Sequence, residues 1–159
     1  MMLRRAFVSL TVAATIVLAG CLESSGPSDA VPIEETNFAS SLDVNLQQST
    51  RTVNGVYYRD LVVGTGAVVA NGQTLDVKYT GWLSSGFQFD SNVNEATPYS
   101  FVLGTGNVIA GWHDGLQGAR VGTTRQLIIP ASMAYGPGGN GPIPGNAVIV
   151  FRVEIVGAS

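Results

Sequence analysis

Apolar and polar residues alternate along much of the chain after residue 50, which is the pattern of half-buried β-strands. In the clearest stretch, Leu75, Val77 and Tyr79 alternate with polar neighbours as far as Leu83. Asn-Gly, Gly-rich and Pro-containing turns bound this strand and its neighbours. Further strands are predicted at 53–63, 87–90, 99–103, 123–129 and 147–156, with a long Gly/Pro loop at 133–145. The sequence therefore predicts an antiparallel sheet.

One segment, 107–118, has the 3.6-residue period of a helix instead. The residues on its apolar arc are Val108, Ile109, Trp112 and Leu116. Gly111 and Gly115 lie beside that arc, and each costs roughly 1 kcal/mol against alanine unless close packing offsets it. Asn107 is the expected N-cap, and Gly118 the expected stop. The pattern predicts an α+β domain in which a curved antiparallel sheet wraps around one short helix.

The first twenty residues have the pattern of a signal peptide. Arg4 and Arg5 precede an uncharged, apolar stretch at 6–19, which is shorter than the ~20 residues of a membrane-spanning helix. The tetrapeptide ending at Cys21, LAGC, resembles a bacterial lipobox, which predicts cleavage before Cys21 and its lipidation. The alternatives are an ordinary cleaved signal with a free thiol, or an uncleaved anchor. Leu22 after the cysteine resembles outer-membrane sorting in a Gram-negative envelope, on the periplasmic side.

Residues 21–50 are predicted to be an acidic, flexible tether, because 22–30 is rich in Ser, Gly and Pro and the stretch 23–43 carries five acidic residues and no basic one. Within it Phe38, Leu42 and Leu46 are spaced by four. This spacing indicates either a short helix or hook that packs on the domain, or a disordered apolar patch. The folded domain is expected to begin near Arg51 and to span 51–159.

Composition and charge exclude several classes of function. The chain of 159 residues has a net charge of −3, and without Arg4 and Arg5 it has six basic and eleven acidic residues, a net charge of −5. This balance argues against nucleic acids or anionic lipid headgroups as partners. Cys21 is the only cysteine and His113 the only histidine, so no metal cluster, internal disulfide or Ser-His-Asp set is expected. His113 falls on the polar side of the helix and is expected to be plain surface.

Aromatic residues are in surplus around the predicted helix. They lie in elements that can converge on it: Tyr79, Phe89, Tyr99, Phe101, Trp112, Tyr135 and Phe151. Asp90 is the polar exception, because a carboxylate that is buried beside Phe89 would need partners. Together these residues predict an apolar cup with a few polar groups.

The motifs that surround these residues resemble one family. In chain order they are VKYTGWL at 77–83, Gly86, FDS at 89–91, FVLG at 101–104, VIAGW at 108–112, Gly115-Leu116, Val121-Gly122, Ile129-Pro130, AYG at 134–136 and Ile143-Pro144. Their order and spacing, over about residues 55–156, resemble the FKBP-type peptidyl-prolyl cis-trans isomerases. Any one motif is weak evidence, but the ordered set is strong.

The resemblance implies a prolyl pocket floored by Trp112, in which Asp90, Tyr135 and Tyr79 are catalytic. The Ile109 N–H and the Tyr135 hydroxyl would bond substrate carbonyls, and Asp90 would lie beside the twisting amide. Substrate-binding residues would be Phe89, Tyr99, Phe101, Val108, Ile109, Trp112, Phe151 and, as a cap on the rim, Ile143. Loop 92–97 lacks the arginine with which many members pair the aspartate, and carries Glu95 near that place.

The implied function is cis-trans isomerisation of Xaa-Pro bonds (EC 5.2.1.8) in unfolded or folding envelope proteins. It would need no metal or cofactor, and macrolides such as tacrolimus would compete for the pocket. A second interpretation, a chaperone module that binds proline-containing peptides with low turnover, follows from the unpaired Asp90.

Overall fold

The computed structural model describes residues 30–159. The predicted signal peptide, Cys21 and the first part of the predicted tether lie outside this range. Within it, no helix is both long enough and apolar enough to cross a bilayer.

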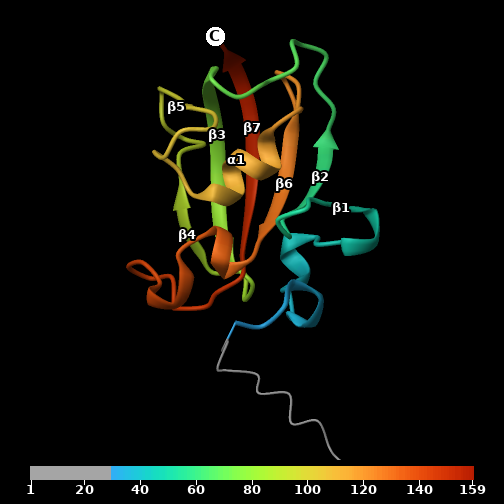
Figure 1. The fold of residues 1–159 in the computed structure, drawn as a ribbon, viewed down its shortest axis with the longest axis vertical. Helices are drawn as coiled ribbons and strands as arrows, with labels where there is room; N and C mark the ends of the chain where they lie inside the picture. The colour runs from blue at the N-terminus through green and yellow to red at the C-terminus, as the bar shows by residue number, and fades with distance from the viewer. Residues whose placement is uncertain (1–29) are drawn as a thin grey trace, which may run out of the picture.

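The domain is built on one antiparallel sheet of seven strands, which curves around a short helix (Figure 1). The strands are β1 (Thr50–Arg51), β2 (Tyr57–Val62), β3 (Thr74–Leu83), β4 (Gln88–Ser91), β5 (Tyr99–Val102), β6 (Thr124–Ile129) and β7 (Ile149–Ala158). Their order is β1-β2-β6-β7-β3-β4, and β5 pairs with the first half of β3 while β4 pairs with its second half. The predicted strands and the α+β class are confirmed.

Helix α1 (Ala110–Leu116) lies against the concave face of the sheet and inside the predicted range 107–118 (Figure 1). Its two glycines make this position possible. A Cβ on Gly111 would lie 2.4 Å from Ile129 Cγ2, and one on Gly115 would lie 2.6 Å from Leu127 Cδ2. Both distances are shorter than real Cβ contacts, so a larger residue at either position would require the helix or the β6 side chain to shift. The close approach expected from the glycine edge is therefore confirmed, with β6 side chains as the partner.

The ends of α1 agree only in part with the sequence. Gly118 has φ +76°, the left-handed conformation expected of a glycine just after a helix. Asn107 is not the N-cap: that position is Ile109, and no side chain caps the helix. The Asn107 N–H instead bonds to the Thr105 carbonyl at 2.8 Å, which shapes the loop before the helix.

His113 is not the plain surface residue that was expected. It is half-buried, and its Nδ1 accepts a hydrogen bond of 2.8 Å from the backbone N–H of Gly104, in the loop between β5 and α1. Its Nε2 is buried without a hydrogen-bond partner. The helical wheel placed His113 opposite the core, but it could not show that this loop folds back over that side of the helix.

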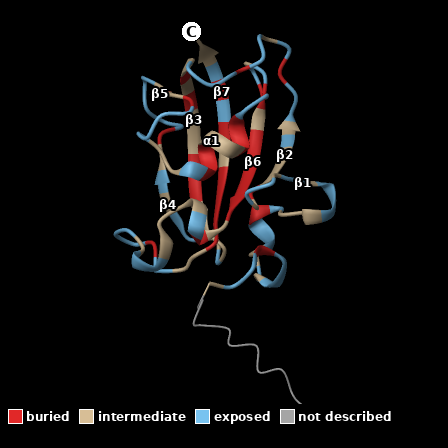
Figure 2. Cartoon of the chain, in the orientation of Figure 1, coloured by how far each residue is buried: buried red, intermediate tan, exposed pale blue. Residues whose placement is uncertain are grey.

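The strands bury side chains on both faces. On β7, Ile149, Phe151 and Val153 join the main core beneath the helix, whereas Val150 and Val148, which directly precedes the strand, join a second cluster on the convex face, as the alternation predicts. Figure 2 shows that the buried residues concentrate in the middle strands and in α1.

Residues 33–48 cover the convex cluster, which corrects the prediction of a flexible tether for this stretch. They form three 3₁₀ turns, Ile33–Glu35, Ser40–Leu42 and Leu46–Gln48, which together are called the hook below. Ile33 and Leu42 are 3% and 4% exposed and pack in the cluster with Ile128, Val148 and Val150. Of the two alternatives for this stretch, the structure has the packed hook, without an α-helix, and folded structure begins before Arg51.

A buried arginine joins the helix to the sheet, which the sequence did not indicate. The Arg125 side chain on β6 is 5% exposed and pairs with Asp60 on β2, with an Nε–Oδ1 distance of 2.6 Å. Its Nη1 donates to the Gly115 carbonyl at 2.8 Å, and its guanidinium lies over the Tyr58 ring. Arg125 thus holds the C-terminal turn of α1 while satisfying its own buried charge.

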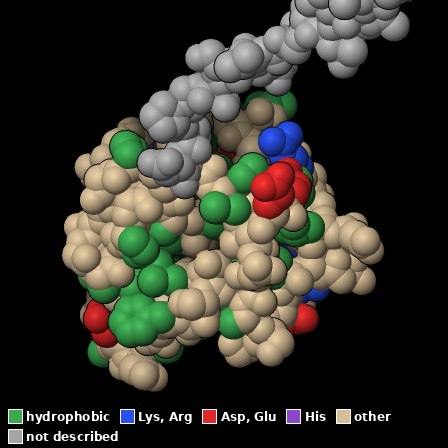
Figure 3. All heavy atoms as spheres, turned by 90° about the horizontal axis from the view of Figure 1, so that it is seen from below, with side chains coloured by type: hydrophobic (Ala, Val, Ile, Leu, Met, Phe, Trp, Pro, Cys, Tyr) green, Lys and Arg blue, Asp and Glu red, His purple; other side chains and the backbone are tan. Residues whose placement is uncertain are grey.

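The end of the domain that carries the β3–β4 turn and the hook has a mixed surface. Seen from below, hydrophobic side chains lie in patches among polar surface, and charged side chains are few (Figure 3). A hollow of about 530 Å³ lies between the hook, the β3–β4 turn and the loop before β7, with Val31, Leu83 and Pro144 in its lining.

The hook is expected to contribute to stability. Replacing Leu42 by alanine leaves a cavity over Ile128 and Val150, so the variant L42A should unfold with a free energy lower by about 2–4 kcal/mol. Chemical denaturation followed by tryptophan fluorescence measures this difference. The matched control is V53A, because Val53 is 98% exposed and its truncation should change stability by less than about 0.5 kcal/mol. Equal stability of both variants would contradict the assignment of the hook to the folded domain.

Candidate functional site

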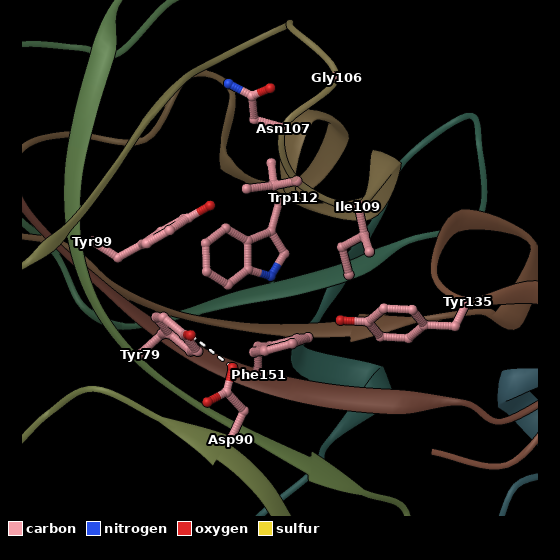
Figure 4. A pocket seen from close by; sticks show the side chains of 10 residues that line it. Tyr79, Asp90, Tyr99, Gly106, Asn107, Ile109, Trp112, Tyr135 and Phe151 are labelled. Carbon is pink, nitrogen blue, oxygen red and sulfur yellow. Dashed lines mark hydrogen bonds between the residues drawn. The ribbon is translucent and has the colours of Figure 1, made fainter. Parts of the chain in front are cut away.

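A cavity of about 390 Å³ opens beside α1, where the loop before the helix faces β3, β4 and β7. Its lining residues are Tyr79, Asp90, Tyr99, Gly106, Asn107, Val108, Ile109, Trp112, Tyr135 and Phe151 (Figure 4). Eight of these ten residues are among those predicted for the site. The fold therefore gathers side chains from six segments of the chain around one hollow.

Trp112 forms the floor of the cavity. Its side chain is only 4% exposed because aromatic rings surround it, yet it still lines the hollow. Tyr79 and Phe151 meet it edge-on, with ring centroids 5.1 Å and 5.2 Å away, and Phe101 supports it at 5.5 Å. Edge-to-face contacts of this kind hold rings in fixed orientations. The cavity therefore has a rigid apolar base of about the size that accepts a small ring.

Asp90 lies at the edge of the cavity, on β4, and its Oδ2 accepts a hydrogen bond of 2.7 Å from the Tyr79 hydroxyl (Figure 4). The partner that the sequence analysis required for the Asp90 carboxylate is therefore the hydroxyl of Tyr79. The carboxylate itself is exposed, which corrects the expectation that it would be buried. Burial of the Tyr79 ring, the hydrogen bond to Asp90 and the nearby negative charges raise the pKa of the Tyr79 hydroxyl well above its usual range.

The loop after β4 is fixed to β3 by a buried asparagine that the sequence did not single out. Asn92 is 4% exposed; its Nδ2 donates to the Val77 carbonyl at 3.1 Å, and its Oδ1 accepts from the Tyr79 N–H at 2.7 Å. Asn92 thus satisfies β3 backbone groups where β4 has ended and β5 has not begun. Asn92 thereby ties the chain just after β4, two residues beyond Asp90, to the backbone of Tyr79.

Hydrogen-bond donors face the cavity from its other side. The Tyr135 hydroxyl points into the hollow in Figure 4 and makes no hydrogen bond to the other residues drawn there. Burial, together with the charge of Asp90, raises the pKa of Tyr135 above its usual value. Ile109 precedes the first turn of α1, and no acceptor is found for its N–H within residues 30–159. Both groups remain available to carbonyl oxygens of a bound peptide.

Three residues predicted for substrate binding do not line the cavity. Phe101 is 3% exposed and supports Trp112 from behind, and Phe89 packs edge-on against Phe151 at 5.5 Å. Ile143 was expected to cap the rim, but it is 5% exposed and belongs to the main core. Conversely, Gly106 and Asn107 line the wall without having been predicted. Their position depends on the fold of the loop before α1, for which the alternating pattern gave no signal.

The site is built from aromatic rings, hydroxyls and one carboxylate. Among residues 30–159, no three His, Cys, Asp or Glu side chains converge on a point where a metal ion could be held. What the arrangement offers is an apolar surface, an exposed anion and unpaired donors, which suits binding without covalent chemistry.

Comparison with known proteins identifies this arrangement. The family model of FKBP-type peptidyl-prolyl cis-trans isomerases matches residues 66–156. An FK506-binding protein of Neisseria meningitidis serogroup B is 40% identical over 105 residues, which cover 65% of this chain and 96% of that protein. FK506-binding protein 4 of Rhizopus delemar is 44% identical over 108 residues, which are 67% of this chain. That relative is longer, and the match spans only 28% of its length.

Solved structures agree with these matches. The crystal structure of AtFKBP13 covers 70% of this chain, at 34% identity and a TM-score of 0.65, and 98% of its own length is matched. The crystal structure of FkpA from Escherichia coli covers 71% of this chain, at 33% identity and the same TM-score of 0.65, with 52% of its own length matched. The fold and the sequence thus lead to the same conclusion: the chain belongs to the family of FKBP-type peptidyl-prolyl cis-trans isomerases, which are enzymes of class EC 5.2.1.8.

Proposed function

We propose that this chain accelerates cis-trans rotation of Xaa-Pro bonds in unfolded or folding polypeptides, with the proline ring seated on Trp112. The observation that carries the proposal is the cavity itself. An indole floor, an exposed carboxylate and two unpaired donors lie around a hollow of about 390 Å³. Family membership supports the same reaction.

The mechanism follows from the nature of the bond. Rotation about a peptide bond has a barrier of roughly 18–20 kcal/mol, because the twisted state loses amide resonance. In that state the carbonyl is less polar and the nitrogen becomes a better hydrogen-bond acceptor. An apolar floor favours the less polar state over the planar amide, relative to water. Neither effect requires a nucleophile.

The polar groups would then orient the substrate. The Ile109 N–H and the Tyr135 hydroxyl bond carbonyl oxygens on either side of the proline, and Asp90 lies beside the twisting amide. Holding the peptide in a turn-like pose removes part of the entropic cost of the transition state. A total gain of about 7–8 kcal/mol corresponds to a rate increase of roughly 10⁵–10⁶.

A chaperone module with low turnover is the second candidate. The specific observation in its favour is that no cation pairs with Asp90 within the described residues, so the carboxylate is held by Tyr79 alone. Proline-containing segments would then bind on Trp112 without fast rotation.

The names of the relatives suggest a ligand as well as a reaction. Two of them are FK506-binding proteins. We therefore include in the proposal that tacrolimus competes with peptide for the cavity. The location is a further part: the LAGC motif supports a lipid anchor at Cys21 and an envelope protein that acts on secreted chains.

The isomerase proposal is tested with a short Leu-Pro peptide, in a protease-coupled or NMR exchange assay. The chain should accelerate the interconversion, and tacrolimus should abolish the acceleration. Y79F removes the hydrogen bond to Asp90, which should lower kcat/KM about tenfold, the equivalent of about 1.4 kcal/mol.

The matched control is Y57F. It also removes one tyrosine hydroxyl bonded to a carboxylate, that of Glu34 on the convex face. It should leave kcat/KM unchanged. A wild-type protein that does not accelerate the interconversion of the Leu-Pro peptide refutes the isomerase proposal. In that case, suppression of client-protein aggregation by both the wild type and Y79F supports the chaperone candidate.

Activity should not fall on the alkaline side as the pH approaches 10. Tyrosine ionises near pH 10 in an unfolded chain, and the raised pKa values of Tyr79 and Tyr135 keep both hydroxyls protonated beyond that point in the folded one. The stability that these groups contribute is therefore complete below about pH 10 and is lost only above it. NMR exchange rates between pH 7 and 10 should be flat. A decline with a midpoint below 10 that Y135F lacks would contradict this prediction.

The lipid anchor is tested in cells on the full chain. C21A should abolish metabolic labelling with a radioactive fatty acid and move the protein from the detergent phase to the aqueous phase, while the isomerase activity stays the same. S24A is the control and should remain labelled. An unlabelled wild type would leave one of the two other interpretations of the N-terminus, a cleaved signal with a free thiol or an uncleaved anchor.

A further inference from the structure

We infer that the site prefers peptides with a basic residue immediately before the proline and disfavours acidic residues there, because the edge of the cavity carries uncompensated negative charge. This inference rests on the proposed isomerase function and adds a substrate class to it.

The charged side chains at the edge of the cavity are all negative. Asp90 is the only Asp, Glu, Lys, Arg or His among the lining residues, and it is exposed to an incoming peptide. Glu95 is also exposed and lies in the loop that follows β4. Asp90 is fixed at this edge by the hydrogen bond of 2.7 Å from the Tyr79 hydroxyl, and loop 92–97, which carries Glu95, follows directly after β4.

Among the basic side chains of residues 30–159, none forms an ion pair with either of these two carboxylates. Three of the six basic side chains in residues 30–159 form ion pairs: Arg51 with Glu34, Arg59 with Asp43, and Arg125 with Asp60. The other three are Arg120, which bonds to the Gly66 carbonyl, Arg152, which lies over Trp82, and Lys78.

Lys78 is the basic residue closest in the chain to the site, but it is occupied. It precedes Tyr79 on β3, so its side chain leaves the strand on the opposite face. Its ammonium donates to the backbone carbonyls of Asn92 and Glu95, and it makes no ion pair with any carboxylate. Lys78 therefore stabilises the loop, and within residues 30–159 neither the Asp90 nor the Glu95 carboxylate forms an ion pair.

A substrate cation can take that place. In the proposed pose, with a proline over Trp112, the preceding residue lies at the edge that Asp90 forms, so a lysine or arginine side chain there comes close to the Asp90 carboxylate. A pair of opposite charges at such an exposed edge is attractive at low salt and is screened at high salt. Since the same attraction acts before and during rotation, the gain should appear in KM rather than in kcat.

The test compares three peptides that differ only in the residue before proline, Lys, Leu or Glu, in 10 mM and 500 mM salt. At low salt kcat/KM should fall in the order Lys, Leu, Glu, with about a five- to tenfold difference between Lys and Glu. At 500 mM salt the difference should shrink to about twofold or less, because the screening length falls to a few ångströms. Equal values at both salt concentrations, or a preference that salt does not reduce, would overturn the inference.

Charge variants locate the effect. E95Q removes one carboxylate outside the cavity lining and should reduce the Lys-to-Glu ratio about twofold to threefold with kcat for the Leu peptide unchanged. The matched control, E35Q, removes an equal charge from the exposed surface of the hook and should keep the full ratio. The same loss of ratio in both variants would mean that overall charge, and not the cavity edge, decides the preference, which would refute the inference.

Binding measured without turnover separates this inference from the proposed function. The three peptides are titrated against the protein while tryptophan fluorescence is followed. A protein that does not accelerate rotation but binds the Lys peptide most tightly at low salt refutes the proposed isomerase function and supports the charge preference. Rapid rotation of all three peptides with equal affinities does the reverse.

Discussion

The arrangement of the whole site depends on how closely a two-turn helix can approach one strand. Gly111 and Gly115 present bare backbone to Ile129 and Leu127 of β6, where any side chain would collide. This contact sets the rotation of the helix about its axis, and the rotation aims Trp112 into the concave face of the sheet. Two glycines in a helix of seven residues cost conformational entropy, which burial of Trp112 and Leu116 offsets.

The cavity combines a rigid floor with polar groups that hold one another in place. Trp112 cannot tilt, because Tyr79, Phe101 and Phe151 surround it. Asp90 is positioned by the Tyr79 hydroxyl, and Tyr79 is in turn held by Asn92 through the backbone. Catalysis by preferential binding of a twisted bond needs such preorganisation, because groups that must reorganise during the reaction stabilise the transition state less.

The two faces of the sheet contribute differently: one forms the cavity, and the other is covered by the hook. The concave face and α1 form the cavity, whereas the convex face is covered by the hook through Ile33 and Leu42. No residue of the hook lines the cavity. The Nε2 of Gln126 on β6 donates to the Leu42 carbonyl at 2.7 Å, so the hook supplies a partner for this buried donor, whereas the Gln126 Oε1 has no hydrogen-bond partner among the described residues. A segment that precedes the first long strand thus stabilises the sheet without narrowing the entrance to the site.

The elements and the aromatic content of the site could be predicted from the sequence, because both depend on local patterns. Alternation along β3 and β7 and the arc of Val108, Trp112 and Leu116 report which face each element buries. The ordered motifs indicated the family, and with it Trp112, Asp90 and Tyr135. These properties reside in short stretches of chain, and no contact between distant residues is needed to recognise them.

Other features were decided by contacts between residues far apart in sequence. Leu42 and Ile128 pack together although they are far apart in the sequence. Because no local pattern reports this contact, the acidic segment that contains Leu42 was interpreted as a solvated tether. The backbone of Gly104 folds back onto His113, which partly buries a residue that the helical pattern placed at the surface. Ile143 lies in the loop before β7 and packs into the main core, whereas Asp90 on β4 is exposed, and neither outcome follows from the local alternation. Local sequence specifies which face a residue occupies, but only the assembled fold determines what that face meets.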